Sequence, residues 1–148
     1  MSDIKEIKFN LIKVTTEQFA ALDIPTEDQK IVFNSSFKFG LGFEEKRIGV
    51  FTNFSYLTDK MPFLLLESGC HFTIEEDYWD KISNKETKSV LLPKGFVSHL
   101  LMLSVGTARG ILHAKTENTP YNEFIIPLIN VTEAVKADIE LSDNREIK

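Results

Sequence analysis

Residues 33–44, FNSSFKFGLGFE, contain five apolar side chains that all fall at odd positions. They are Phe33, Phe37, Phe39, Leu41 and Phe43. The even positions hold polar residues or glycine, including Gly40 and Gly42. Because successive side chains of a β-strand point to opposite faces, the pattern predicts a strand with aromatic rings on one face and bare backbone on the other. Glycine in a strand often marks a close approach by another part of the chain.

Two further segments share this period of two and extend the prediction to a sheet. The three strands are predicted at Ile31–Glu44, Arg47–Thr58 and Pro62–Glu75. They are joined by the short links EEK and TDKM, which favour antiparallel neighbours because parallel strands require a long crossover. Upstream, residues 4–14 alternate loosely and predict an entry strand, while residues 16–22 predict a short turn or helix. The first half of the chain is therefore expected to form an antiparallel meander of long strands.

The clearest helix is predicted at Phe96–Lys115, after a polar segment at residues 76–90 that favours a loop with one helical turn. Apolar residues surround this helix more completely than a one-sided surface helix requires. One side would pack on the sheet, and the other needs a second partner. A neighbouring subunit is the natural candidate.

The last part of the chain predicts little regular structure. Residues 121–131 favour an extended return, in which Pro127 excludes a central-strand position. Thr132 is expected to cap a short final helix at residues 133–139, and residues 140–148 are expected to fray. The sequence thus predicts one α+β domain over residues 1–148, in which a long-stranded antiparallel sheet carries a long helix on one face.

Composition narrows the possible functions. The chain has 148 residues, a net charge of -5 and 12 phenylalanines. Nucleic-acid binding is not expected, because it normally needs a basic stripe and the Lys and Arg residues here are scattered. Cys70 is the only cysteine, so an intrachain disulfide is excluded. The opening residues lack the apolar core of a signal peptide. The segment Phe96–His113 lacks the roughly 20 apolar residues of a membrane span. A cytoplasmic protein without membrane insertion is expected.

In the order of these elements and in several short motifs, the chain resembles the SecB protein-export chaperone family. Residues 68–74, SGCHFTI, are similar to the family's strand ending with glycine, an aromatic residue and isoleucine. Leu91-Leu92-Pro93 resembles the Leu-Phe-Pro before the main helix, and Ala108-Arg109-Gly110 resembles the Ser-Arg-Gly near its end. Pro127 to Val131 resembles the family's Pro-Val-Asn-Phe with one extra residue. The resemblance covers residues 7–136.

The resemblance implies an ATP-independent holdase that binds non-native polypeptides in apolar grooves and assembles as a homotetramer, a dimer of dimers, without a cofactor. The candidate client-binding residues are Phe33, Phe37, Phe39, Phe54, Phe72, Ile74 and Trp79. The candidate subunit-interface residues are Gly40, Gly42, His99, Leu100 and Leu103. From the residues alone, two interpretations stay open for the aromatic rings, since they can form core against the helix or line a groove. The same alternatives hold for Trp79.

The export ATPase SecA is the partner that the resemblance implies, and the candidate docking residues are Glu44, Glu45 and Glu67. Two features differ from the family. Lys94-Gly95 replaces the aromatic residue after Leu-Phe-Pro, and the dense acidic tail is missing. These differences favour an alternative in which the same fold serves as an adaptor or dedicated chaperone for one partner.

A third hypothesis is a small-ligand-binding or thioesterase-like protein, although hotdog thioesterases place their helix before most strands. No enzyme activity, cofactor or metal site is expected. Gly40-Leu41-Gly42 lacks the third glycine and the following helix of a dinucleotide fingerprint. His71, His99 and His113 have no metal-ligand spacing with one another or with Cys70.

Overall fold

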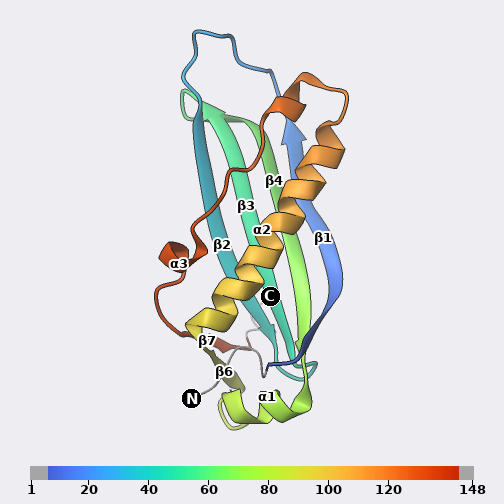
Figure 1. Cartoon of the computed structure of the whole chain (residues 1–148), viewed down its shortest axis with the longest axis vertical. Coiled ribbons are helices and arrows are strands. Elements are labelled where there is room, and N and C mark those ends of the chain that lie inside the picture. Colours follow the sequence, from blue (N-terminus) through green and yellow to red (C-terminus); the bar gives the residue numbers. More distant parts are fainter. Residues whose placement is uncertain (1–6, 144–148) are drawn as a thin grey trace.

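The computed structural model describes residues 7–143 and contains a sheet of four long antiparallel strands (Figure 1). The strands are β1 (Phe9–Ala21), β2 (Val32–Gly42), β3 (Arg47–Thr58) and β4 (Met61–Ile74). One long helix, α2 (Lys94–Thr116), crosses one face of the sheet diagonally. We call this the inner face and the opposite one the outer face. The predicted α+β fold, a long-stranded antiparallel sheet with a helix on one face, is confirmed.

The sheet order is β1-β4-β3-β2, so the two edge strands are β1 and β2. Tight turns join β2 to β3 and β3 to β4, so these three strands form an antiparallel meander. Asp59 and Lys60 both have positive φ, 49° and 67°, and they join β3 to β4 with Thr58 opposite Met61. Left-handed backbone at both central residues is the geometry that matches the twist of a two-residue hairpin. The entry strand then adds to β4 rather than to β2.

Strand β1 is longer than expected, and the turn or helix predicted for residues 16–22 is wrong. The chain stays extended to Ala21, with Phe19 opposite Leu66 of β4. The pairing has irregularities between Leu11 and Lys13 and between Thr16 and Gln18. Each irregularity inserts an extra residue and changes which residues face inward, as β-bulges do. The weak alternation in the sequence therefore comes from a long strand that is interrupted twice.

The core lies between the inner face and α2. The largest fully buried side chains come from both layers, and the helix contributes Phe96, Leu100 and Leu101. By length and mean hydropathy, α2 also passes as a membrane-crossing helix, which corrects the expectation that this segment is too polar. Part of its surface is buried against the sheet, as in the core helix of many proteins. Length and composition alone do not distinguish the two situations.

A small second sheet closes one end of the molecule. The segment predicted as a loop forms α1 (Glu76–Ile82), β5 (Ser83–Asn84) and β6 (Ser89–Leu92). The order of this sheet is β5-β6-β7, in which β7 is Ile139–Ser142. Residues 140–142 therefore pair with β6, and the prediction that they fray is wrong. The rest of that predicted tail, residues 144–148, lies outside the described residues.

The predicted final helix is also misplaced. The structure has a 3-10 turn, η2 (Pro120–Glu123), and one short helix, α3 (Val131–Ala134). Asn130 caps α3, because its side chain accepts hydrogen bonds from the backbone N–H groups of Thr132 and Glu133. Asparagine is as strong a cap as the threonine that was expected. The helix therefore begins two residues earlier than predicted and ends at Ala134.

Residues 124–130, which we call the strap, run over the inner face beside α2 (Figure 1). Arg109 of α2 holds the strap in place. Its Nε donates to the Ile126 carbonyl at 2.8 Å and its Nη2 donates to the Pro127 carbonyl at 2.9 Å. The Tyr56 hydroxyl of β3 donates to the Ile125 carbonyl. The strap is thus fixed by hydrogen bonds to its backbone. Its Ile126 side chain is buried in the core, whereas Ile125 and Leu128 are exposed.

Arg109→Met is expected to lower the free energy of unfolding by about 1.5–3 kcal/mol, the usual range for a hydrogen bond to a charged group. Chemical denaturation measures this loss. Limited chymotrypsin digestion should also cleave faster after Leu128, which is 93% exposed. Arg109→Lys is the matched control, because it keeps the charge but loses the planar fork, and its effects should be intermediate. An unchanged cleavage rate in Arg109→Met would show that Arg109 does not hold the strap.

Candidate polypeptide-binding surface

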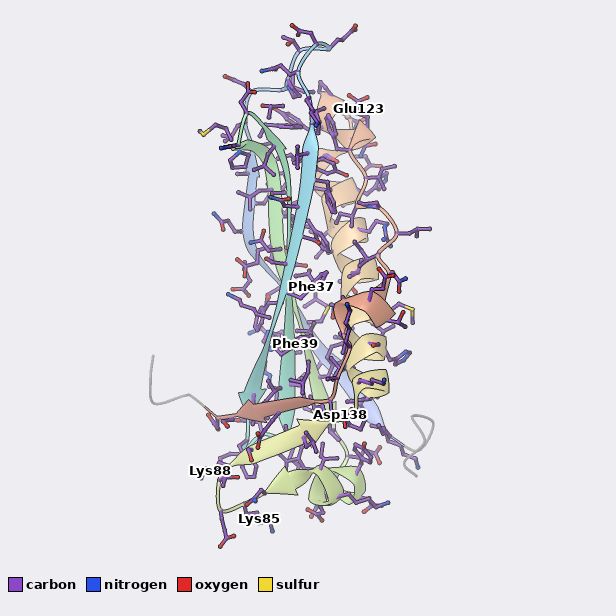
Figure 2. All side chains as sticks on the ribbon, turned by 90° about the vertical axis from the view of Figure 1, so that its left-hand side faces the viewer. Phe37, Phe39, Lys85, Lys88, Glu123 and Asp138 are labelled. Carbon is purple, nitrogen blue, oxygen red and sulfur yellow. The ribbon has the colours of Figure 1, made fainter. Side chains whose placement is uncertain are left out.

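The aromatic row of β2 lies at a free edge of the sheet. Phe33, Phe37 and Phe39 are partly buried and pack against the core, and Figure 2 labels Phe37 and Phe39 along this edge. The Phe33 ring stacks 5.9 Å from the ring of Phe54, and the Phe37 ring meets Phe54 edge-on at 6.0 Å. Each ring therefore contacts the core on one side and keeps some exposed surface on the other. The core interpretation therefore holds in part, and the groove interpretation stays a prediction.

The other four predicted client-binding residues are placed differently. Phe54, Phe72, Ile74 and Trp79 are buried in the core. The first three lie on the central strands β3 and β4, where α2 covers the inner face. Trp79 anchors α1 with its ring 5.3 Å from that of Phe43. Their placement as groove residues is therefore corrected, because all four side chains are packed within the core.

The strap extends the partly exposed row of β2. Ile125 and Leu128 are both exposed on the strap. Tyr56 links the two parts, since its ring lies 5.0 Å from that of Phe33 and its hydroxyl binds the Ile125 carbonyl. We call this the β2 surface, and it consists of Ile31, Val32, Phe33, Phe37, Phe39, Tyr56, Ile125 and Leu128. Sequence analysis missed the strap residues, because nothing in the sequence indicates which side of an extended return is covered.

A second apolar surface lies along β1. Helix α2 runs beside this strand, with the ring of Phe9 5.8 Å from that of His99 and Lys115 over the ring of Phe19. The apolar residues exposed on the two elements are Leu11, Ile12, Val14, Met102 and Leu103, and we call them the β1 surface. Leu11 and Val14 lie opposite the buried Phe72 and Cys70 of β4, so they are on the inner face at the open edge of the sheet. Large exposed apolar patches usually mark contacts with another molecule.

The predicted interface residues are divided between these regions. Leu103 belongs to the β1 surface, and His99 is half-buried against Phe9. Leu100 is fully buried in the core of the subunit, so its placement at an interface is corrected. Its position in α2 points to the sheet, which the all-round apolar character of the helix did not reveal. Gly40 and Gly42 lie on the outer face, far from the β1 surface.

On the outer face, one aromatic ring explains two of the glycines. The Phe51 ring lies over Gly69 and Gly49, where an added Cβ would come within 2.7 Å and 3.0 Å of it, respectively. A Cβ on Gly40 would be 3.8 Å from the same ring, which is an ordinary contact. The glycines thus admit a side chain of the sheet itself. A close approach was expected at Gly40 and Gly42, but Gly40 shows only an ordinary contact; the close approach occurs at Gly49 and Gly69, and the approaching group is an aromatic ring.

Two of the acidic docking candidates form ion pairs. Glu67 lies 3.4 Å from Lys38 on the outer face, and Glu44 lies 3.4 Å from Lys88. The second pair is well exposed, so its contribution to stability is small. Glu45 lies in the hairpin between β2 and β3, beside a hollow in the outer face. Glu44 and Glu45 therefore lie in the hairpin at one end of the sheet, whereas Glu67 lies on the outer face. The three carboxylates do not form one cluster.

Within residues 7–143, no group of three His, Cys, Asp or Glu side chains is placed to hold a metal ion. The apolar β1 and β2 surfaces and the hollow of the outer face are the candidate surfaces for a partner. Comparison of the chain with family models, with curated proteins and with solved structures finds no match.

Proposed function

We propose that this protein is an ATP-independent holdase that binds extended, non-native polypeptides along the β2 surface. The observation that carries the proposal is an edge strand without a hydrogen-bonded neighbour on its outer side, which β7 covers only at its C-terminal end, with partly exposed aromatic rings beside it. Proteins usually protect such edges with charges, proline or a covering segment, because an open edge pairs with other chains. Here the exposed residues Ile31 and Val32 add to the apolar character of the edge.

Two physical features of the β2 surface suit a client without a fixed sequence. Burial of apolar area contributes roughly 25 cal/mol per Å² and does not depend on direction. The backbone groups of an edge strand also pair with any extended chain, because main-chain hydrogen bonds do not depend on side chains. Strand β2 has 11 residues, which corresponds to about 35 Å of extended chain. This length accommodates a client segment of similar size.

The β1 surface is the proposed contact between subunits. On the outward side of α2, a Cβ added to Gly106 or Gly110 would meet no atom within 4 Å among the described residues outside the helix backbone. A neighbouring subunit can therefore approach the helix closely at these positions. Met102 and Leu103 lie beside them. A homotetramer, as in the family that the sequence resembles, would present four β2 surfaces together. Several weak sites on one assembly strengthen binding through effective concentration.

Export and the ATPase SecA belong to the proposal only through the resemblance. A dedicated chaperone for a single partner is the second candidate function. It is favoured by the ion pairs of Glu44 and Glu67, since each of these two carboxylates already has a lysine partner within the subunit. Capture from a lysate distinguishes the two. Many precursors and SecA support general export, and one dominant protein supports the dedicated role.

Light scattering of an aggregating unfolded client tests the holdase. One tetramer per client chain is expected to suppress most of the scattering, and the double variant Ile31→Lys, Val32→Lys should lose at least half of this suppression. Lysines at an open edge oppose the addition of another strand. Leu91→Lys is the matched control, since Leu91 is similarly exposed but lies on β6. Without suppression by the unaltered protein, the holdase is rejected. Full suppression of scattering by the double variant would show that the client does not bind along β2.

A further inference from the structure

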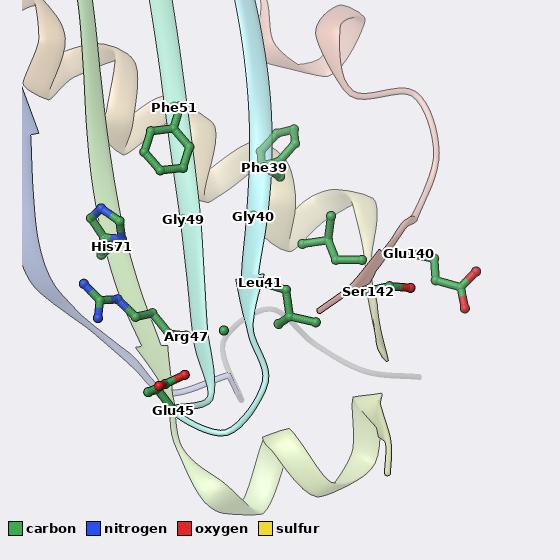
Figure 3. Close-up of a pocket in the computed structure, with 12 residues that line it drawn as sticks. Phe39, Gly40, Leu41, Glu45, Arg47, Gly49, Phe51, His71, Glu140 and Ser142 are labelled. Carbon is green, nitrogen blue, oxygen red and sulfur yellow. The ribbon is translucent and has the colours of Figure 1, made fainter. Parts of the chain in front are cut away.

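A hollow of about 890 Å³ lies on the outer face, where β2 ends and β3 begins (Figure 3). Its floor contains Gly40, Gly42 and Gly49, and the absence of their side chains creates the space. Phe51 and His71 stand on one side, and the end of β7 closes the other. Phe39 lines the hollow and also belongs to the β2 surface, whereas the glycine floor, Phe51 and His71 lie on the outer face.

Arg47 is the unexplained group of this hollow. Its Nε is buried and has no hydrogen-bond partner within the described part of the chain. Figure 3 shows its side chain extending beside His71 along the margin of the hollow. A buried donor without an acceptor costs free energy, so an unpaired one in a native structure requires an explanation. A bound acceptor that completes the fork of the guanidinium is such an explanation.

His71 does not add a second positive charge here. Partial burial lowers the pKa of His71 below its ordinary value, and the charges of Arg47 and Lys13 lower it further against the opposing effect of Glu17. The imidazole is therefore neutral at pH 7. Its ring meets the Phe51 ring edge-on at 5.5 Å. The wall of the hollow thus combines one cation, Arg47, with a neutral aromatic surface.

The acidic residues at the hollow restrict the charge of a ligand. Glu45 and Glu140 both line it, and Figure 3 shows the Glu140 carboxylate directed away from the glycine floor. Two negative charges nearby disfavour a dianion such as a phosphate monoester. A single carboxylate matches one guanidinium in charge and in planar shape, since the two groups pair through parallel hydrogen bonds.

We propose that the hollow binds a monocarboxylate attached to a flat apolar group. Arg47 would receive the carboxylate, and the apolar group would lie beside the Phe51 ring over Gly40, where an added Cβ meets that ring only at 3.8 Å. The same chemistry occurs in small aromatic acids and at the C-terminus of a polypeptide that ends in an aromatic residue. The proposal does not depend on the holdase function, which uses the inner face and the edges.

The test is an NMR titration of the full chain with 3-phenylpropionate, with 3-phenylpropionamide as the neutral control. Saturable shifts are expected at the amides of Gly40, Gly49 and His71, and the amide ligand should bind at least about tenfold more weakly. A tripeptide ending in phenylalanine, with a free or amidated C-terminus, distinguishes the two sources. Tenfold tighter binding of the free peptide indicates a polypeptide terminus, and otherwise a small acid is indicated. Equal binding of acid and amide, or no saturable shifts up to about 20 mM, overturns the proposal.

Two variants test the site itself. Arg47→Met should weaken binding of 3-phenylpropionate by at least about tenfold, while Lys30→Met removes an exposed positive charge elsewhere and should leave it unchanged. Gly40→Val fills the floor of the hollow. It should keep the fold, because a Cβ there meets the Phe51 ring only at 3.8 Å, and it should also weaken binding about tenfold. Unaltered affinity in Gly40→Val rejects the site, even if Arg47→Met fails to fold.

Discussion

Phe72→Ala is expected to lower the free energy of unfolding by about 3–5 kcal/mol, the range for truncating a buried phenylalanine. The Phe72 side chain is 0% exposed and lies on β4 under α2. Its ring meets that of Phe9 edge-on at 5.8 Å, so the substitution removes an aromatic contact between β4 and β1. The cavity would open in the middle of the sheet, where the neighbouring strands cannot move in to fill it.

Phe37→Ala is the matched control for this prediction, because it removes the same side chain from the edge strand. Phe37 is only partly buried, so we expect a loss of about 1–2 kcal/mol from the smaller apolar area that it buries. Trp79, the only tryptophan, reports unfolding through its fluorescence. Both variants must be compared at one protein concentration, since association adds to apparent stability. An equal loss in the two variants would contradict the difference in burial on which the prediction rests.

The two substitutions should also differ in function. Per folded chain, Phe72→Ala should suppress client aggregation as well as the unaltered protein, whereas Phe37→Ala should be weaker. Selective loss of client binding in Phe72→Ala, without loss of stability, would show that this ring reaches a client after all. The pair therefore separates a core role from a binding role for residues that have the same chemistry and similar sequence surroundings.

Gly69→Ala is expected to destabilise the protein by about 1–3 kcal/mol through overpacking. A Cβ at this position would lie 2.7 Å from the Phe51 ring and 2.8 Å from Thr15 Oγ1. Either the ring must leave its place on the sheet or the strands must separate. Gly40→Ala should change the stability in the opposite direction. Its Cβ has room, and alanine loses less backbone entropy on folding than glycine, so the substitution should stabilise the protein by up to about 1 kcal/mol. Thermal and chemical unfolding of both variants measure the contrast.

The double variant Gly69→Ala, Phe51→Ala tests the cause of this cost. If the ring is the obstacle, the two substitutions together should destabilise less than the sum of the single effects, which gives a coupling of about 1 kcal/mol or more. Additive losses would instead assign the cost to Thr15 or to the backbone. Such additivity would contradict the role of Phe51 in filling the space above the glycines.

The periodic segments of this fold were predictable from the sequence, and the long-range pairings were not. Strand β3 begins and ends where its alternation predicts, at Arg47 and Thr58, because both of its faces are specified by side chains. Strand β1 was shortened in the prediction, since its alternation is broken by bulges that exist only against β4. Likewise, β7 was not predicted, because it is a strand only through its pairing with β6. Neither feature leaves a local pattern in the sequence.

The candidate surfaces depended on the same long-range information. The row of Phe33, Phe37 and Phe39 was found by its period, and its exposure follows from the position of β2 at an edge. Phe54 and Phe72 have the same period, but they lie on central strands and are buried. Sequence alone does not distinguish an edge strand from a central one when the pairing of β1 is unknown. The sequence did not indicate a role for Arg47, because the lack of a hydrogen-bond partner for its Nε within the described residues depends on which side chains surround it in the fold.

The pairing of β1 with β4 also has a consequence during synthesis on the ribosome. Strand β1 ends at Ala21 and β4 begins at Met61, so the first strand emerges several seconds before its partner at a translation rate of about 5–20 residues per second. Helix α2, which covers the inner face, follows later still. The nascent chain therefore carries Leu11, Ile12 and Val14 unpaired through this interval, when association with neighbouring chains competes with folding.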